Sequence, residues 1–566
     1  MITEMKNTKF EKVNDEQWKE AAVKSLRGLP FERLITKTLE GIDIQPLYTK
    51  EQVEENLPNQ SSLLQTIRYS MKTPDWTIAQ QSYATNGEQF VNEVKESLEK
   101  GNEAIVYDGS RPVEWSENSL KELAKLVVTY PIYAFDVKDS DEFIKIFSII
   151  DEAERKEVKG AVYGASLPEG YHLIRTSCAD TTDIHLKGAD AVTELAVTLA
   201  KAAENAQSFE SFTKFENSFF ARFAIDTEFF MEIAKLRAFR VLWQTFAQAY
   251  GVEKVSRVPI FSETSLRTYT KLDQYVNLLR AGNEAFSAVL GGTDVLTVHP
   301  HNVVATVTPA AERNARNIQL IIKEETFVQY VLDPAGGSYF IDTLTNEMVE
   351  KAWALFQEIE AQGGYAAYVA SGKLDEKLKD LSKKRLQQVS QGEKSLIGTN
   401  IYANLADELP EESTIEVTGR LAEPYEKLRA TFAENQPKTV LLTFGQLKDF
   451  KPRADFVLGF LATAGIKSES SPAFDSVEEA KKWIAENDFD YGVICAHPNE
   501  IEDVMNELIS DLPNKWIDVA GKYDEETEAK WIEAGVSGFI YKGQDQLEKL
   551  SSIQKRWEEV EQHEKA

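Results

Sequence analysis

The sequence predicts an α/β protein with a large domain built on a parallel sheet or a (β/α)8 barrel, and a small doubly wound domain. At 566 residues the chain is too long to fold around one core. Between about residue 62 and residue 365, short apolar runs alternate with segments of helical periodicity, which is typical of parallel α/β domains. From residue 438 onward the same alternation recurs on a smaller scale.

Residues 1–60 are predicted to form an N-terminal arm. A helix is expected near Asp15–Leu26, followed by the extended stretch KTLEGIDIQPLY at 37–48. The arm lies outside both predicted cores, yet it carries apolar side chains that are costly to leave in water, so we expect it to be an interface element. These side chains are Trp18, Leu26, Phe31, Leu34, Pro46, Leu47 and Tyr48.

Residues 61–395 are predicted to form the large domain. Its strand-like runs include EAIVYDG (103–109), IYAFDV (132–137), HLIRTSC (172–178) and VVATVT (303–308), and its helical segments include Asp190–Ala206, Glu228–Tyr250 and Leu272–Val289. A linker at 396–437 precedes the small domain at 438–566. The small domain's strand-like runs are TVLLTF (439–444), YGVICA (491–496), KWIDVA (515–520) and GFIYKG (538–543).

The composition excludes several classes of partner. With 63 basic and 92 acidic side chains the formal net charge is −29, and such a surface repels the phosphates of nucleic acids and anionic lipids. An anionic substrate therefore needs a local basic pocket. The first twenty residues are polar and lack a signal-peptide core, and no apolar run reaches the roughly 18 residues that span a membrane. We expect a cytoplasmic protein, and the two distant cysteines, Cys178 and Cys495, to be buried thiols.

Four motifs carry residues that could bind a ligand or a metal. HPH at 299–301 offers two imidazoles to a metal, but no cysteine or third histidine stands nearby, so we expect no metal site. The glycine turns DPAGGS (333–338) and LGGT (290–293) match no phosphate-binding fingerprint, and a steric role is favoured. Arg237 and Arg240 on the helix FFMEIAKLRAFRVLW (229–243) could serve an anionic ligand, but a barrel-packing helix with solvated arginines is favoured.

The stretch TFGQLKDFKPRAD (443–455) is predicted to be a loop between a strand and a helix running from Phe456 to Ala464. Loops at the carboxyl ends of parallel strands are where ligands bind in doubly wound domains. This one has no group suited to holding a cofactor. His185, in the large domain, likewise has no nucleophile matched to it by spacing.

Eight ordered blocks resemble the methylmalonyl-CoA mutase family. They are TLEGIDIQPLY, PDWTIAQQSY, GADAVTELAVTLA, FFMEIAKLRAFRVLW, SETSLRT, ARNIQLIIKEET, DPAGGSYFIDTLT and KAWALFQEIEAQGGY. The resemblance implies an N-terminal arm, a substrate-holding (β/α)8 TIM-type barrel, a linker and a C-terminal flavodoxin-like cobalamin domain. This order agrees with the organisation predicted from the residue pattern.

The barrel blocks depart from the catalytic pattern of the family. Where catalytic chains read T-[IV]-R-Q-Y-A-G, this chain has Ala79 for the arginine and Gln81 for the tyrosine that lies against the reacting acyl group. In the block G-Y-H-x-x-E-A-G-A, the tyrosine becomes Thr182 and the general-acid-type histidine becomes Asp183. Tyr269 replaces the histidine after SLRT, and the substrate-wrapping segment that follows is shorter.

The cobalamin turn departs in the same way. The family's D-x-H-x-x-G falls on Lys448, Phe450 and Arg453. The histidine donates a lone pair to cobalt and the aspartate orients its ring, and neither replacement can do this. The resemblance therefore implies that this chain carries no catalytic residues, no cofactor and no metal of its own.

In lacking both sites the chain resembles the small (beta) subunit of the family's heterodimeric enzymes. The stretches NDEQWKEAAVKSLRG and RLAEPYEKLR also resemble that subunit. It implies a heterodimer with a catalytic large (alpha) subunit that carries adenosylcobalamin and interconverts succinyl-CoA and methylmalonyl-CoA. Two alternatives stay open. One is an autonomous enzyme that binds another acyl-CoA, with Arg222, Arg267 and Lys271 on its phosphates. The other is an assembly or chaperone-like partner of the mutase.

Overall fold

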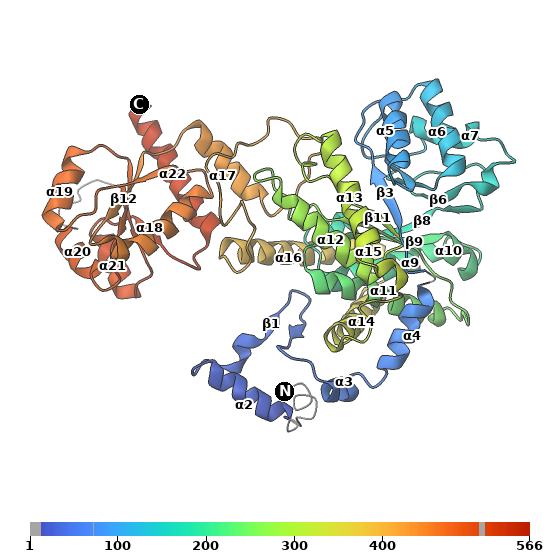
Figure 1. Cartoon of the computed structure of the whole chain (residues 1–566), viewed down its shortest axis with the longest axis horizontal. Helices are drawn as coiled ribbons and strands as arrows, with labels where there is room; N and C mark the ends of the chain where they lie inside the picture. Colours follow the sequence, from blue (N-terminus) through green and yellow to red (C-terminus); the bar gives the residue numbers. More distant parts are fainter. Residues whose placement is uncertain (1–12, 72, 509–515, 566) are drawn as a thin grey trace, which may run out of the picture.

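The computed structural model describes residues 13–71, 73–508 and 516–565. It forms two α/β domains at opposite ends of a long molecule, with α16 (Lys373–Ser390) and α17 (Glu423–Glu434) between them (Figure 1). The polar stretch 1–12, on which part of the N-terminal prediction rests, lies outside the described residues. Both cysteines are buried free thiols, as predicted.

The large domain is a parallel barrel, which confirms the predicted fold class. All strand pairs in its sheet are parallel, in the order β7-β6-β5-β4-β3-β11-β10-β9-β8. β7 and β8 are one run interrupted at Thr176 and count as one strand position. The described strands therefore form the eight strand positions, here called staves, of a (β/α)8 barrel. The strands are β3 (Thr77–Gln81), β4 (Ala104–Asp108), β5 (Ile132–Phe135), β6 (Lys159–Val162), β7 (Leu173–Arg175), β8 (Ser177–Asp180), β9 (Phe219–Ile225), β10 (Ile260–Thr264) and β11 (Val295–Thr297).

Two strand predictions are corrected. HLIRTSC is not one continuous strand, since it divides at Thr176 into β7 and β8. VVATVT is not a strand, because the eighth stave is the earlier run Val295–Thr297. Val303 and Val304 are buried in a turn beyond that stave. Their apolar character reflects burial in a loop, which a periodicity argument cannot distinguish from burial in a sheet.

Helices surround the barrel where the alternation predicted them. Asp190 begins α9 by accepting a hydrogen bond from the Thr193 backbone N–H, and the third predicted helix starts later than expected, at Val276. The main ones are α5 (Gly87–Glu99), α6 (Glu117–Thr129), α8 (Thr182–Leu186), α9 (Ala191–Ala206), α10 (Phe212–Ser218), α11 (Phe229–Ala249), α12 (Val276–Gly291), α13 (Pro309–Glu325), α14 (Tyr339–Ala361) and α15 (Tyr365–Ala370).

The arginines of α11 are not solvated, contrary to the prediction. The helix packs against α4 (Gln60–Ser70), α9, α12 and α14, so it has almost no exposed face. Arg237 is 0% exposed and Arg240 is 3% exposed. Arg237 pairs with both Asp333 and Asp342, and Arg240 pairs with Asp294. A charged residue on a helix enclosed by other helices is buried only when it is paired, and the partners come from distant sequence.

The C-terminal domain is a five-stranded parallel sheet in the order β13-β12-β14-β15-β16, the flavodoxin-like arrangement. Separate apolar clusters cover its two faces. β13 (Ser468–Ser470) was not predicted, because it is a short polar edge strand. The other elements are β12 (Thr439–Thr443), β14 (Tyr491–Cys495), β15 (Trp516–Ala520), β16 (Gly538–Ile540), α18 (Leu447–Ala462), α19 (Val477–Glu486), α20 (Ile501–Leu508), α21 (Glu525–Glu533) and α22 (Gln546–Lys565).

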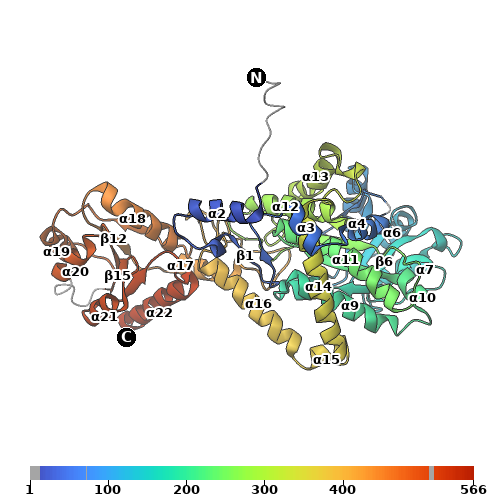
Figure 2. The ribbon, with the colours of Figure 1, turned by 90° about the horizontal axis from the view of Figure 1, so that it is seen from below.

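The arm is only loosely attached to the rest of the chain. It comprises α2 (Asp15–Ser25), a 3-10 turn at Phe31–Leu34 and α3 (Lys50–Asn56). The stretch predicted as extended folds back into an antiparallel hairpin of β1 (Thr36–Lys37) and β2 (Asp43–Ile44). Ile42 alone is buried among residues 13–52. In both views α2 lies between the two domains along the long axis (Figure 2).

Candidate functional site

The barrel residues aligned with catalytic positions each contact different neighbours. Ala79 lies in β3 and is buried in the inner layer of the barrel. Gln81 ends that strand, and its side-chain amide donates to the Asp108 carboxylate at 3.4 Å. Tyr269 follows β10 and is fully buried, with its hydroxyl donating to the backbone carbonyl of His299 at 3.2 Å.

The residues on α8 lie outside this group. Asp183 is exposed and pairs with Lys187 one helical turn later, at 2.8 Å. The Thr182 hydroxyl donates to the Asp180 carboxylate at 2.7 Å, which closes the start of the helix. Asp183 therefore contacts solvent where the resemblance places a general acid. Its side chain is occupied by a surface ion pair.

Arg222 is the principal charge at the mouth of the barrel. Its guanidinium donates to Asp180 at 2.8 Å and to Glu263 at 2.6 Å. Asp136 lies 3.8 Å away. Burial raises the pKa of Asp136, Arg222 opposes this shift, and the other acids at the mouth add to it. Burial also opposes ionisation of Glu263, but Arg222 and His299 lower its pKa to about 2. Carboxylates outnumber cations here, which disfavours an anionic acyl group.

Aromatic rings fill the barrel beneath that mouth. The Arg222 guanidinium lies 4.1 Å from the ring centre of Phe135. Phe135 and Phe261 meet edge to face at 4.6 Å, and Tyr133 lies 5.6 Å from Phe261. Phe220 is buried in the same layer. Close-packed side chains of this kind make the barrel interior a core.

The cations assigned to an acyl-CoA in the autonomous-enzyme alternative are already engaged. Arg267 is 2% exposed, donates to Asp226 at 2.7 Å and also donates to the Ala189 carbonyl at 2.9 Å. Lys271 lies 3.9 Å from Glu416. With Arg222 held by its carboxylates, none of the three is an unpaired cation for a phosphate.

His185 has partners that the sequence did not reveal. Its Nδ1 lies 2.6 Å from a Glu194 carboxylate oxygen and its Nε2 lies 2.7 Å from the Ser265 hydroxyl. Burial and the Arg267 cation lower the pKa of His185 to about 4. The neutral ring then donates to Glu194 and accepts from Ser265. This arrangement has the order of a Ser-His-acid set, so the statement that His185 lacks a nucleophile is corrected. All three side chains are buried, so a substrate has no access to them.

The two histidines of HPH diverge. The Nδ1 of His299 lies 2.8 Å from the Tyr83 hydroxyl, while His301 stacks on Tyr275 with ring centres 5.3 Å apart. Among the described residues no group of three or more histidine, cysteine or carboxylate side chains is arranged to hold a metal. The glycine turns have steric roles: a Cβ at Gly336 would meet the Asp333 carboxylate at 2.3 Å, and Gly292 ends α12 with φ +84°.

The predicted ligand loop at 443–455 is mostly helix, which corrects the sequence prediction. α18 begins at Leu447, with a capping box between Gln446 and Asp449. Lys448 is exposed on its first turn. Pro452 lies within the helix, which continues because one face packs into the domain core. That face comprises Phe450, Ala454, Val457 and Leu461.

Phe450 and Arg453 are built into this packing. Phe450 is 9% exposed and belongs to the core on its side of the sheet. The Arg453 guanidinium donates to the Tyr523 hydroxyl at 3.1 Å, and a Cβ placed at Gly521 would meet it at 3.1 Å. Neither the phenyl ring nor the guanidinium supplies a lone pair to cobalt. The residues present do not fit a cobalamin bound through a protein ligand at this turn.

Comparison with known proteins agrees with this architecture. A family model described as methylmalonyl-CoA mutase matches residues 171–463, from the fifth stave of the barrel to the end of α18. The chain belongs to the methylmalonyl-CoA mutase family. This confirms the resemblance identified in the sequence.

Relatives from this family are 27–31% identical to this chain over the aligned residues. The "methylmalonyl-CoA mutase small subunit" of Porphyromonas gingivalis is 27% identical over 561 residues, covering 87% of this chain and 89% of that protein. The "probable methylmalonyl-CoA mutase small subunit" of Mycobacterium tuberculosis is 31% identical over 371 residues, covering 62% of this chain but only 60% of that protein. The "methylmalonyl-CoA mutase" of Cereibacter sphaeroides is 28% identical over 484 residues. No described helix is both long enough and apolar enough to cross a bilayer.

Proposed function

We propose that this chain is the non-catalytic small subunit of a cytoplasmic, adenosylcobalamin-dependent methylmalonyl-CoA mutase and that it pairs with a catalytic large subunit. The observation that carries the proposal is the packing of α18. Where the family's cobalt-ligating histidine falls by alignment, the chain places Phe450 in a packed core. The names of several relatives as small subunits support the same assignment.

The barrel supports the proposal independently of the cobalamin domain. Aromatic rings occupy its interior, and Arg222 at its mouth is committed to Asp180 and Glu263. A thioester with a free carboxylate would enter against surplus negative charge. Adenosylcobalamin on the large subunit supplies the radical that starts the isomerisation. This chain contributes a folded partner to the complex.

Co-expression with a candidate large subunit tests the pairing. We expect the two chains to co-purify and to elute together from gel filtration as a heterodimer. Separate elution at micromolar concentration would overturn the proposal. The assembly-partner alternative predicts that this chain dissociates once the large subunit has received its cofactor, so gel filtration is repeated with the holoenzyme.

Deleting residues 1–50 is expected to abolish co-purification. α2 contains no buried residue, yet Trp18 and Phe31 form an edge-to-face pair at 6.1 Å and Lys19 lies over Phe31. Both rings are half-buried, so part of each apolar side chain stays in contact with solvent. Tyr48 instead contacts Phe340 of α14 at 5.3 Å, which anchors the end of the arm.

The double variant Trp18→Ala, Phe31→Ala is the matched test that keeps the chain at full length. It should weaken pairing by at least about tenfold, in line with the loss of two aromatic anchors. Lys50→Ala, at an exposed position in α3, is the control. Undiminished pairing of both the deletion and the double variant would show that the arm is no interface, provided circular dichroism shows a folded chain.

Restoring a histidine is not expected to restore cobalamin binding. Phe450→His places the imidazole in the core between α18 and the sheet, with Lys448 rather than an aspartate two residues before it. Without an acceptor to orient the ring, one nitrogen cannot define a ligand site. Titrating the full chain and this variant with hydroxocobalamin should leave the visible spectrum unchanged. Tight binding by the parent chain, or full binding after this one substitution, would contradict the alignment of the turn.

A further inference from the structure

A cavity of about 400 Å³ lies on the outer wall of the barrel. It is bounded by the end of α4, the middle of α11 and the segment that leads into β10. α4 and α11 pack side by side (Figures 1 and 2). The volume is in the range of small-molecule sites. None of its lining residues belongs to the barrel mouth or to the cobalamin turn.

The lining of this cavity is basic in a strongly acidic protein. It contains Arg240, Lys254 and Arg257 and no aspartate or glutamate. Both arginines pair with the same carboxylate, Asp294, which lies behind the lining. Lys254 is exposed and forms no ion pair within the described chain. The second nearby acid, Glu216, accepts a hydrogen bond from the Ser256 backbone N–H. The residues that line the cavity therefore carry only positive formal charges.

Burial lowers the pKa of both guanidinium groups, although each pairs with Asp294. It lowers the pKa of Arg240 to about 9. It lowers the pKa of Arg257 to about 10, and the neighbouring Arg240 cation contributes to that shift. An anion beside the pair would offset this cost.

Three N–H donors of the lining residues have no acceptor. They are the Nε of Arg240, the Nε of Arg257 and the indole Nε1 of Trp243, all buried. Buried donors are nearly always satisfied, so three unpaired donors among the lining residues favour an acceptor-rich ligand. The chain's own acceptor beside the two arginines is the Asp294 carboxylate, which pairs with both of them. Tyr69, 64% exposed, adds an aromatic face at the rim.

We propose that this cavity binds a phosphorylated small molecule with a planar ring. Lys254 and the Arg257 guanidinium hold its phosphate groups, while Arg240 stays bonded to Asp294 and to the Val258 and Gly292 carbonyls behind them. The ring lies between Tyr69 and Trp243. The proposal depends only on residues of the outer wall, so it is independent of the proposed small-subunit function.

Isothermal titration of the full chain with inorganic pyrophosphate and with adenosine diphosphate tests the proposal. Both should bind, and adenosine diphosphate should bind more tightly. Arg257→Gln should weaken pyrophosphate binding by about tenfold, and the exposed Lys254→Gln by a few-fold. Lys50→Gln, an exposed lysine on α3, is the matched control and should leave it unchanged.

Absence of pyrophosphate binding to the parent chain at millimolar concentration would overturn the phosphate site. Equal effects of Lys254→Gln and Lys50→Gln would also overturn it, because both remove one positive charge from the protein and only one of them removes it from the cavity. If Arg257→Gln fails to fold by circular dichroism, the Lys254→Gln comparison decides. Equal affinity for the two probes would overturn the aromatic part of the proposal.

Discussion

The purified chain alone is expected to show no mutase turnover at saturating adenosylcobalamin. Loss of one general acid or base typically costs about 10²–10⁴-fold in rate. Here Asp183 faces solvent in place of the histidine, Gln81 replaces the tyrosine and Phe450 replaces the cobalt ligand. These losses affect separate steps, so the deficit relative to the complete enzyme should exceed about 10⁴-fold.

The assay compares this chain, the large subunit and their mixture at equal concentration, following conversion of methylmalonyl-CoA to succinyl-CoA. Activity should accompany the large subunit in every fraction. Pairing with the Trp18→Ala, Phe31→Ala variant serves as the control for contamination, because it removes the interface and leaves the barrel unchanged. Cobalamin-dependent isomerisation by a preparation free of large subunit would establish an autonomous enzyme instead.

The second large effect is on stability, at Arg237. Its Nε donates to Asp333 at 2.8 Å and its Nη2 donates to Asp342 at 2.7 Å, with all three side chains 0% exposed. The Thr345 hydroxyl accepts a further hydrogen bond at 2.8 Å. The guanidinium thus holds α11 to the DPAGGS turn and to the first turns of α14. Arg237→Met leaves two buried carboxylates unpaired and should cost about 3–5 kcal/mol.

Urea unfolding followed by barrel tryptophan fluorescence measures this loss in the full chain. Lys187→Met is the matched control, since it breaks the exposed pair with Asp183 and should cost less than about 1 kcal/mol. Adding Asp333→Asn and Asp342→Asn to Arg237→Met removes the unpaired charges and should recover part of the stability. A loss at Arg237→Met no larger than that of Lys187→Met would refute the structural role of this buried set.

The fold was predictable because its signals are local. Alternation of apolar runs with helical segments gave both domains and most of their elements. It failed at Val303 and Val304, because a buried turn has the same composition as a strand. It failed again at 443–455, where Pro452 and the charges obscured the spacing of Phe450, Ala454 and Val457 along one helix face. That spacing was the signal available to find α18 earlier.

From the sequence alone, the candidate site could be described only by its substituted motif positions. The substituted motif positions indicated which catalytic groups are replaced. The contacts of the buried polar side chains in the barrel could not be predicted in this way, because they join residues far apart in the sequence. Ser265 lies 80 residues from His185, and Asp333 lies 96 residues from Arg237. No spacing rule connects such pairs, since the barrel topology brings them together. The arginines of α11 were accordingly expected in solvent, although their carboxylates enclose them.

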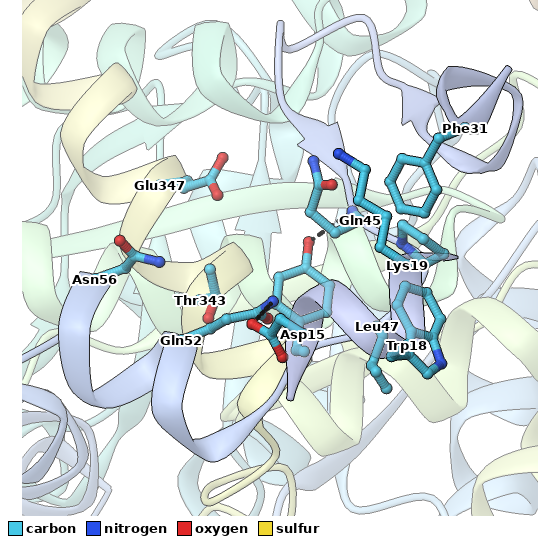
Figure 3. Close-up of a pocket in the computed structure, with 12 residues that line it drawn as sticks. Asp15, Trp18, Lys19, Phe31, Gln45, Leu47, Gln52, Asn56, Thr343 and Glu347 are labelled. Carbon is cyan, nitrogen blue, oxygen red and sulfur yellow. Dashed lines mark hydrogen bonds between the residues drawn. The ribbon is translucent and has the colours of Figure 1, made fainter. Parts of the chain in front are cut away.

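Figure 3 shows the pocket between the arm and α14, where we propose that the large subunit binds. Trp18, Lys19 and Phe31 of the arm stand over a cavity of about 380 Å³, with Glu347 and Thr343 of α14 on its far side. Gln52 donates to Asp15 at 2.7 Å and ties α3 to α2. The arm is therefore held in shape while the apolar side chains predicted to form its interface stay half-buried or, at Pro46 and Leu47, exposed.

The cobalamin content of the purified complex tests the central claim most directly. Large and small chains are co-expressed, purified by a tag on this chain, loaded with adenosylcobalamin and analysed for cobalt and for both polypeptides. We expect one cobalamin for each pair of chains, and none on this chain when it is isolated. Two cobalamins for each pair, or one bound to this chain alone, would contradict the claim.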